Sequence, residues 1–261
     1  MCLIMIIFVL FIILMVILAY FVLCNTKYVL HNTKCIFGGG FNNMDIYMIR
    51  HGETDKNKEG KPPTPDTPLN ETGRQQAVQT GKQLSKMEPF DCVYVSPFIR
   101  TRETAELILN ELPYHPNIIF DERLREIDKG NLDDVDDPND DFNRILKEYK
   151  EKYSTDKLFY QHFDEMEDEL LKYYTFEKLS EITQRLTEFY EELKSSGHKR
   201  VLLIMHKGSI QISMQILFNI GETSFNIGAK RQDFKNCSIS HVLYNGDYKL
   251  ISSANTDHLI L

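Results

Sequence analysis

The sequence predicts an α/β fold, with a mostly parallel sheet and helices on both faces, preceded by an N-terminal hydrophobic helix. From Asp45 onward, short apolar runs alternate with helical stretches, and this alternation is typical of parallel strands covered by helices. Val201–Met205 is a continuous apolar run, as expected of a strand buried on both faces. A chain of 261 residues has room for one such domain and an appendage.

The hydrophobic stretch at the N-terminus is long enough to cross a membrane. Residues Cys2 to Cys24 include no charged, Gly, Pro or Asn residue, and a run of this length spans the roughly 30 Å hydrocarbon core of a bilayer. A helix at the surface of a soluble domain would show a polar face, and this run has none. Nothing basic precedes Cys2 and no Ala-x-Ala site follows, so a membrane anchor is favoured over a cleaved signal peptide.

The residues that follow indicate orientation and domain organisation. Lys27 and Lys34 lie just after the hydrophobic run, and the preference for positive charge on cytoplasmic loops places the rest of the chain in the cytosol. We expect a transmembrane helix at residues 1–24, a flexible linker at 25–43 and one globular domain at 44–261. Met44 stands directly before the first strand, so translation beginning there would give a cytoplasmic protein without the anchor.

The composition excludes some function classes. The formal net charge is −8, whereas nucleic-acid binding needs a basic surface to neutralise phosphates. The five cysteines are widely spaced and odd in number, which favours neither a zinc site nor a disulfide framework. We therefore expect no nucleic-acid partner and no metal.

The expected elements of the globular domain follow from local patterns. Asn70 is a plausible N-cap for the first helix, and Pro113 ends the second. The turn Asn245-Gly246-Asp247 is typical of a hairpin that closes the sheet. The expected strands are Asp45–Ile49, Phe90–Val95, Ile118–Phe120, Val201–Met205, Ser238–Tyr244 and Tyr248–Ser252, and the expected helices are Leu69–Lys86, Thr101–Leu112, a long helical region Asp141–Leu193 with a break near Tyr153–Asp156, and Ser209–Phe218.

Cationic and imidazole side chains follow three of these strands. Arg50-His51, Ser96 to Arg100, and His206 each come after the carboxyl end of a strand, and ligands of open α/β sheets gather at that edge. A phosphate monoester is a dianion, so its transfer needs fixed positive charge, an in-line nucleophile and an acid for the leaving oxygen. Two arginines supply bidentate donors, and a neutral histidine attacks through one ring nitrogen when the other is held.

An ordered set of motifs extends this pattern over most of the domain and resembles the histidine phosphatase superfamily, the phosphoglycerate-mutase-like fold. The set is Arg50-His51-Gly52-Glu53-Thr54, Asn57, Leu69 to Ala77 (LNETGRQQA), Ser96 to Ala105 (SPFIRTRETA), Leu124 to Gly130 (LREIDKG), Met205-His206-Lys207-Gly208, Asn236 to Ile239 (NCSI) and Asn255 to Leu259 (NTDHL).

The resemblance implies a role for each matching residue. His51 would be the phosphorylated nucleophile, and Glu126 would be the proton donor. Arg50, Arg100 and His206 would clamp the phosphoryl group, and Asn57 would assist phosphate binding. Water would then hydrolyse the phosphohistidine, without a cofactor or a metal, and the partner would be a small phosphorylated substrate or a phosphoprotein.

Two departures from the family pattern concern substrate choice. Lys207 replaces the Gly that the family usually has after its second histidine; it either adds charge for a more anionic substrate or points to solvent, and the solvent reading is favoured. The aromatic-rich loop that often follows the acid is replaced by Asn131 to Asp134. The sequence therefore does not distinguish between four classes of substrate: a sugar phosphate, a nucleotide, a phosphoprotein and a lipid phosphate. It also does not predict the oligomeric state.

The phosphatase side of the family fits better than its other branches. The mutase sequence Glu-Arg-His-Tyr is absent, since Ile127 follows Glu126, and Thr54 stands where phytase-like members carry a further Arg. Three functions remain open: a phosphatase, which is favoured, a phosphoglycerate-mutase-type transferase, and an inactive module that binds a phosphoester. The complete set of catalytic residue types argues against the inactive module, which has no use for an acid.

Overall fold

A six-stranded sheet in the order β3-β2-β4-β1-β5-β6 forms the centre of the computed structural model. Strands β1 to β4 are parallel to one another, whereas β5 is antiparallel to both of its neighbours. The sheet is therefore mixed, because the C-terminal hairpin adds an antiparallel pair to four parallel strands. The strands are β1 (Met44–Arg50), β2 (Cys92–Val95), β3 (Asn117–Phe120), β4 (Arg200–Met205), β5 (Ile239–Tyr244) and β6 (Tyr248–Asn255).

The structure describes residues 43–131, 141–153, 163–219 and 233–260. The predicted transmembrane helix and nearly all of the predicted linker lie outside these ranges, so the membrane anchor stays a prediction. Within the ranges given, no helix is both long and apolar enough to cross a bilayer.

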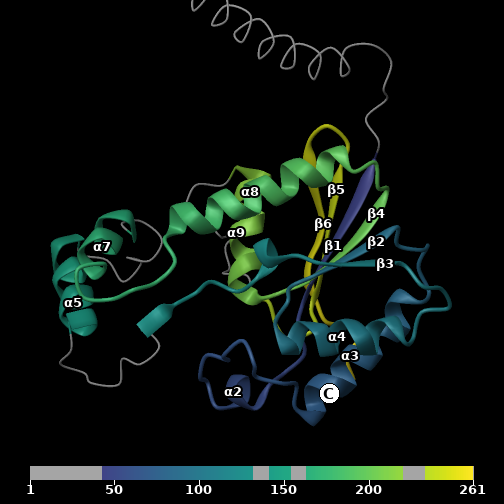
Figure 1. The fold of residues 1–261 in the computed structure, drawn as a ribbon, viewed down its shortest axis with the longest axis horizontal. Helices are drawn as coiled ribbons and strands as arrows, with labels where there is room; N and C mark the ends of the chain where they lie inside the picture. The colour runs from purple at the N-terminus through teal and green to yellow at the C-terminus, as the bar shows by residue number, and fades with distance from the viewer. Residues whose placement is uncertain (1–42, 132–140, 154–162, 220–232, 261) are drawn as a thin grey trace, which may run out of the picture. The chain divides into compact units, whose positions relative to one another are not determined.

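Helices cover both faces of the sheet (Figure 1). Alternate residues of β4 face opposite sides: Leu203 packs in one core cluster with α8 and α9, and Leu202 packs in the other with α3 and α4. This two-sided burial explains the continuous apolar run of β4. The helices are α2 (Asp55–Lys58), α3 (Glu71–Leu84), α4 (Ile99–Leu109), α5 (Asp141–Tyr153), α7 (Phe163–Leu170), α8 (Leu179–Ser195), α9 (Lys207–Phe218) and the short 3-10 helix η1 (Glu122–Leu124).

The helix predicted at Leu69–Lys86 is present as α3, with the predicted N-cap. The Asn70 side chain accepts a hydrogen bond from the backbone N–H of Gly73 at 2.8 Å, so Asn70 is the N-cap of α3. Gly73 also lets the helix approach the chain after β1, since a Cβ there would lie 2.1 Å from the carbonyl oxygen of Glu53. The start of α3 is thus fixed against the segment that follows His51.

The long helical region is divided into α5, α7 and α8. α5 ends at Tyr153, where the break was predicted to begin, and the rest of the predicted break, to Asp156, lies outside the described residues. A second interruption, at residues 171–178, was not predicted. Its backbone is held by residues 128–131: the N–H of Glu177 donates to Asp128 at 2.8 Å, and the N–H of Asn131 donates to Thr175 at 3.2 Å. These long-range bonds replace helical ones, and local periodicity carries no sign of them.

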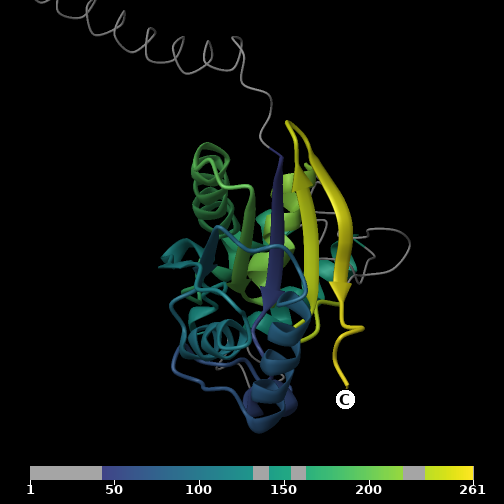
Figure 2. The same ribbon diagram turned by 90° about the vertical axis from the view of Figure 1, so that its right-hand side faces the viewer.

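The strand register brings three strand ends to one level. Arg50 of β1 is paired with Met205 of β4, and the next N–H, that of His51, donates to the Met205 carbonyl at 3.0 Å. On the other side of β4, the N–H of Ser96 donates to Ile204 at 3.0 Å. The predicted gathering of these residues at the carboxyl edge is therefore confirmed, and Figure 2 shows the β5–β6 hairpin (yellow) beside β1 (purple).

Candidate active site

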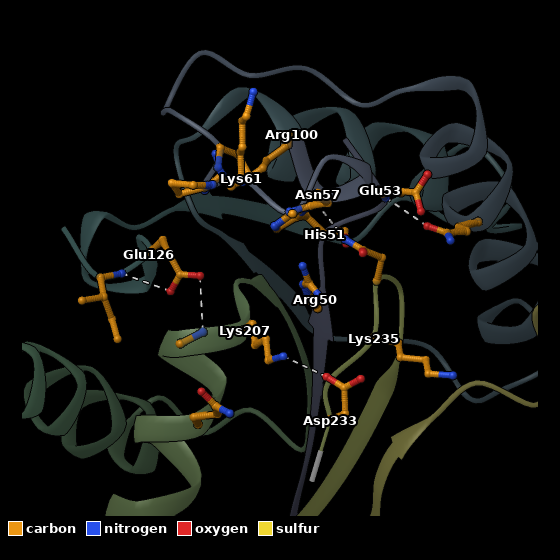
Figure 3. Close-up of a pocket in the computed structure, with 18 of the residues that line it drawn as sticks. Arg50, His51, Glu53, Asn57, Lys61, Arg100, Glu126, Lys207, Asp233 and Lys235 are labelled. Carbon is orange, nitrogen blue, oxygen red and sulfur yellow. Dashed lines mark hydrogen bonds and ion pairs between the residues drawn. The ribbon is translucent and has the colours of Figure 1, made fainter. Parts of the chain in front are cut away.

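A cleft of about 910 Å³ opens at this edge of the sheet, and Arg50, His51, Asn57, Arg100 and Glu126 all line it (Figure 3). These residues come from the end of β1, from α2, from α4 and from the loop after η1. Five of the six sequence-predicted site residues therefore share one hollow. His206, the sixth, is not among the residues that line the cleft, although it lies next to His51.

His51 is held as a neutral nucleophile would be. Its ring is 2% exposed, and Nδ1 lies 2.7 Å from the carbonyl oxygen of Gly52. A carbonyl only accepts, so Nδ1 carries the proton and Nε2 keeps its lone pair. Burial and the charges of Arg100 and Arg50 hold the pKa of His51 well below its usual value, which keeps the ring neutral at physiological pH.

Arg50 and Arg100 bring uncompensated positive charge to the cleft. Each guanidinium donates to a backbone carbonyl, Arg50 to Phe234 at 2.9 Å and Arg100 to Thr64 at 2.7 Å. Neither forms an ion pair with a carboxylate in the described part of the chain. Burial, with a contribution from Arg50, lowers the pKa of Arg100 to about 10. Both groups remain charged at neutral pH, and an anion between them would be stabilised by both.

His206 packs against His51 and is hydrogen-bonded to Ser96. The two ring centroids are 5.2 Å apart, and the His206 ring is fully buried. Its Nε2 lies 2.8 Å from the hydroxyl of Ser96, while Nδ1 is buried without a hydrogen-bond partner. Burial, followed by the effects of His51 and the two arginines, lowers the pKa of His206 well below its usual value. Direct contact of His206 with a phosphoryl group stays a prediction.

Glu126 enters the cleft from the loop after η1 and caps helix α9. Its carboxylate accepts hydrogen bonds from the backbone N–H groups of Gly208 at 3.3 Å and Ser209 at 3.2 Å. A Cβ on Gly208 would lie 2.6 Å from the Glu126 carboxylate, so the glycine lets the carboxylate approach the backbone closely. The glycine that seats the acid thus comes two residues after His206.

A buried ion-pair network fixes the loop that carries Glu126. The carboxylate of Glu177 accepts from Arg185 Nε at 2.7 Å, from Arg125 at 2.6 Å and from the N–H of Asp128 at 3.2 Å. Arg185 also donates to the carbonyl of Arg123. Arg125 and Asp128 flank Glu126, so a segment from the interrupted helical region positions the acid.

Asn57 is fixed by partners that leave its amide nitrogen available. Its Oδ1 accepts from the N–H of Thr54 at 3.3 Å and from Asn236 Nδ2 at 3.2 Å, and its Nδ2 has no partner among the described residues. Asn236 Nδ2 also donates to the carbonyl of His51 at 2.9 Å. Asn236 was not predicted to take part in the site, although it opens the motif at residues 236–239.

The comparison with protein families decides the family. The model of the histidine phosphatase superfamily (branch 1) matches residues 46–257. The chain belongs to this superfamily. Among the described residues, no group of three or more His, Cys, Asp or Glu side chains is placed to hold a metal ion.

The relatives of this chain include proteins named as phosphatases and proteins named as mutases. A Schizosaccharomyces pombe protein named "Probable phosphatase" is 31% identical over 173 residues, which are 65% of this chain and 71% of that protein. A Salmonella choleraesuis protein named "Probable phosphoglycerate mutase" is 37% identical over 91 residues, 34% of this chain and 41% of that protein. The crystal structure of phosphoglycerate mutase from Bacillus anthracis has a TM-score of 0.64 at 21% identity, covering 84% of this chain and 96% of that one, and shows the shared fold.

Proposed function

We propose that this protein hydrolyses a phosphate monoester through a phosphohistidine on His51. The observation that supports this most is a neutral imidazole with one nitrogen bonded to Gly52. It lines a cleft beside two arginines that pair with no carboxylate among the residues described. Positive charge that is held in place around a nucleophile stabilises the negative charge on the oxygens of a phosphoryl group during its transfer.

In the first step, Nε2 of His51 attacks phosphorus and the ester bond breaks. Arg50 and Arg100 hold the phosphoryl oxygens, and the Asn57 amide donates to the same group. Glu126, protonated, gives its proton to the leaving oxygen, so an alcohol departs. In the second step, water attacks the phosphohistidine and passes a proton to the Glu126 carboxylate. Inorganic phosphate is released and His51 becomes neutral again.

The experiment uses the full-length chain, kept in detergent, with p-nitrophenyl phosphate and a panel of phosphate esters. We expect release of inorganic phosphate that EDTA does not inhibit. His51→Ala should abolish it, whereas His115→Ala, which changes an exposed histidine in a segment that lines no part of the cleft, should leave it intact. A rapid quench with labelled ester should trap an acid-labile phosphate on the wild type and none on His51→Ala.

The mutase alternative is favoured by some of the sequence relatives. It predicts an isomerised phosphoester without net release of phosphate. Retained phosphoester binding with neither reaction would support the inactive binding module, and either result would refute the hydrolase.

A further inference from the structure

The cleft is more basic than a single phosphoryl group requires. Its cationic lining residues are Arg50, Arg100, Lys61, Lys129, Lys207 and Lys235, and its carboxylates are Glu53, Glu126 and Asp233. The chain as a whole carries a net charge of −8. Positive charge is therefore concentrated in the cleft, although the whole chain is acidic. This distribution favours an anionic ligand in the cleft.

Two of the three carboxylates form no ion pair with these cations in the described part of the chain, although the charge of Glu126 acts on both arginines. Glu126 accepts from the backbone N–H groups of Gly208 and Ser209, and Glu53 accepts from the Asn70 amide at 2.9 Å. The third, Asp233, forms an ion pair with Lys207. Six basic residues thus line the cleft beside three acidic ones.

Lys207 lines the cleft with a side chain that is still 40% exposed, so it reaches solvent as was favoured from the sequence. It is the first residue of α9, directly after His206, and its Nζ is 2.8 Å from Asp233 Oδ1. The ion pair with Lys207 lowers the pKa of Asp233, with smaller contributions from Arg50 and Lys235. An ammonium group has three donors, so Lys207 keeps two for a ligand while Asp233 fixes its direction (Figure 3).

The size of the cleft also exceeds one phosphoryl group. Its volume of about 910 Å³ is in the range of pockets that hold a whole small molecule. The phosphoryl position proposed above, at Arg50, His51 and Arg100, takes only part of this space. Lys207 and Asp233 line another part, from the start of α9 and the segment before β5.

We propose that Lys207, oriented by Asp233, forms a second anion subsite, so that the substrate is a phosphate monoester with a further carboxylate or phosphate group. This inference rests on the proposed function, because the first phosphoryl group is assigned to the His51 side of the cleft. A neutral leaving group would leave the donors of Lys207 to water.

The test compares esters that differ only in the second anion. Phenyl phosphate is paired with 4-carboxyphenyl phosphate, and glucose 6-phosphate with glucose 1,6-bisphosphate, using the full-length protein. For each pair, kcat/KM and the calorimetric Kd are measured for the wild type, for Lys207→Gln and for Lys82→Gln, a matched control at an exposed position near the end of α3.

We expect the wild type to prefer the doubly anionic member of at least one pair, and Lys207→Gln to reduce that preference about tenfold or more, as for loss of a charged hydrogen bond. The pair that responds identifies the second group as carboxylate or phosphate. The same ratio in wild type and Lys207→Gln, or the same loss in Lys82→Gln, would overturn the subsite. The Kd ratio tests it even without turnover, whereas absence of turnover alone counts against the proposed hydrolase.

Discussion

Replacement of Gly208 by alanine should separate acid catalysis from stability. Gly208 is the second residue of α9 and lies next to the Glu126 carboxylate. A Cβ at Gly208 would be 2.6 Å from Oε1 of Glu126 and 2.7 Å from Cδ1 of Ile127. Ordinary van der Waals contact begins at 3.4 Å. The carboxylate must therefore move away by about 0.8 Å, the difference between 2.6 and 3.4 Å. This movement weakens its hydrogen bonds to the backbone N–H groups of Gly208 and Ser209.

A displacement of this size should affect the reaction strongly. Misplacement by about 1 Å costs up to roughly 100-fold in rate, within the contribution expected of a general acid. We expect kcat for an alkyl phosphate to fall about 100-fold in Gly208→Ala. The value for p-nitrophenyl phosphate should fall much less, because p-nitrophenolate leaves readily without a proton.

The stability of this variant should change little. Alanine is favoured over glycine inside a helix by about 1 kcal/mol, which offsets part of the cost of moving a flexible side-chain end. We expect the free energy of unfolding, from urea denaturation, to change by less than about 2 kcal/mol. Gly197→Ala is the control: a Cβ at Gly197 meets nothing within 4 Å, although its φ of +77° makes alanine strained. It should lose some stability and no activity.

Equal losses for both esters in Gly208→Ala would show that the substitution damages the site in general. Wild-type turnover of the alkyl ester by a folded variant would refute the assignment of Glu126 as the acid.

Three further predictions concern stability and location. The pKa of His51 and that of His206 are lowered in the folded protein, mainly by burial, and are near 6.5 when the chain unfolds. The contribution of these histidines to the free energy of unfolding should therefore be fully present above pH 6.5 and fall below it by about 1.4 kcal/mol per pH unit for each histidine. Urea denaturation across pH checks this, and an equal slope in His51→Gln would contradict it. Glu177→Gln should cost about 3 kcal/mol of unfolding free energy, because Arg185 loses a buried partner; a loss under about 1 kcal/mol would show that the network is not stabilising. Full-length protein should pellet with membranes at its intact mass, and recovery in the supernatant would argue against an anchor at residues 2–24.

The sequence predicted the parts of the site that depend on strand ends. Arg50, His51 and Ser96 follow apolar runs, and parallel strands in register carry such residues to one edge whatever the details of packing. The hydrogen bond between His206 and the Ser96 hydroxyl was not predictable, because Ser96 follows another strand.

Contacts between distant segments account for the other differences. The interruption after α7 is maintained by backbone bonds to residues 128–131, and the position of Lys207 is set by Asp233, which lies beyond α9. A helical pattern and the exposure usual for lysine both describe local preferences, and they contain no information about such partners. The role of Gly208 likewise becomes visible only once Glu126 is placed beside it.

The central strand of the sheet is synthesised long before either of its neighbours. β1 ends at Arg50, whereas its partners β4 and β5 begin at Arg200 and Ile239. At 5–20 residues per second, the ribosome needs roughly 10 to 40 s to deliver both. Until β4 is complete, the apolar side chains Ile46 and Met48 belong to a strand with both edges unpaired, and one edge stays unpaired until β5 follows. The nascent chain thus passes through an aggregation-prone stage, and a truncation between β4 and β5 would leave the second edge of β1 unpaired permanently.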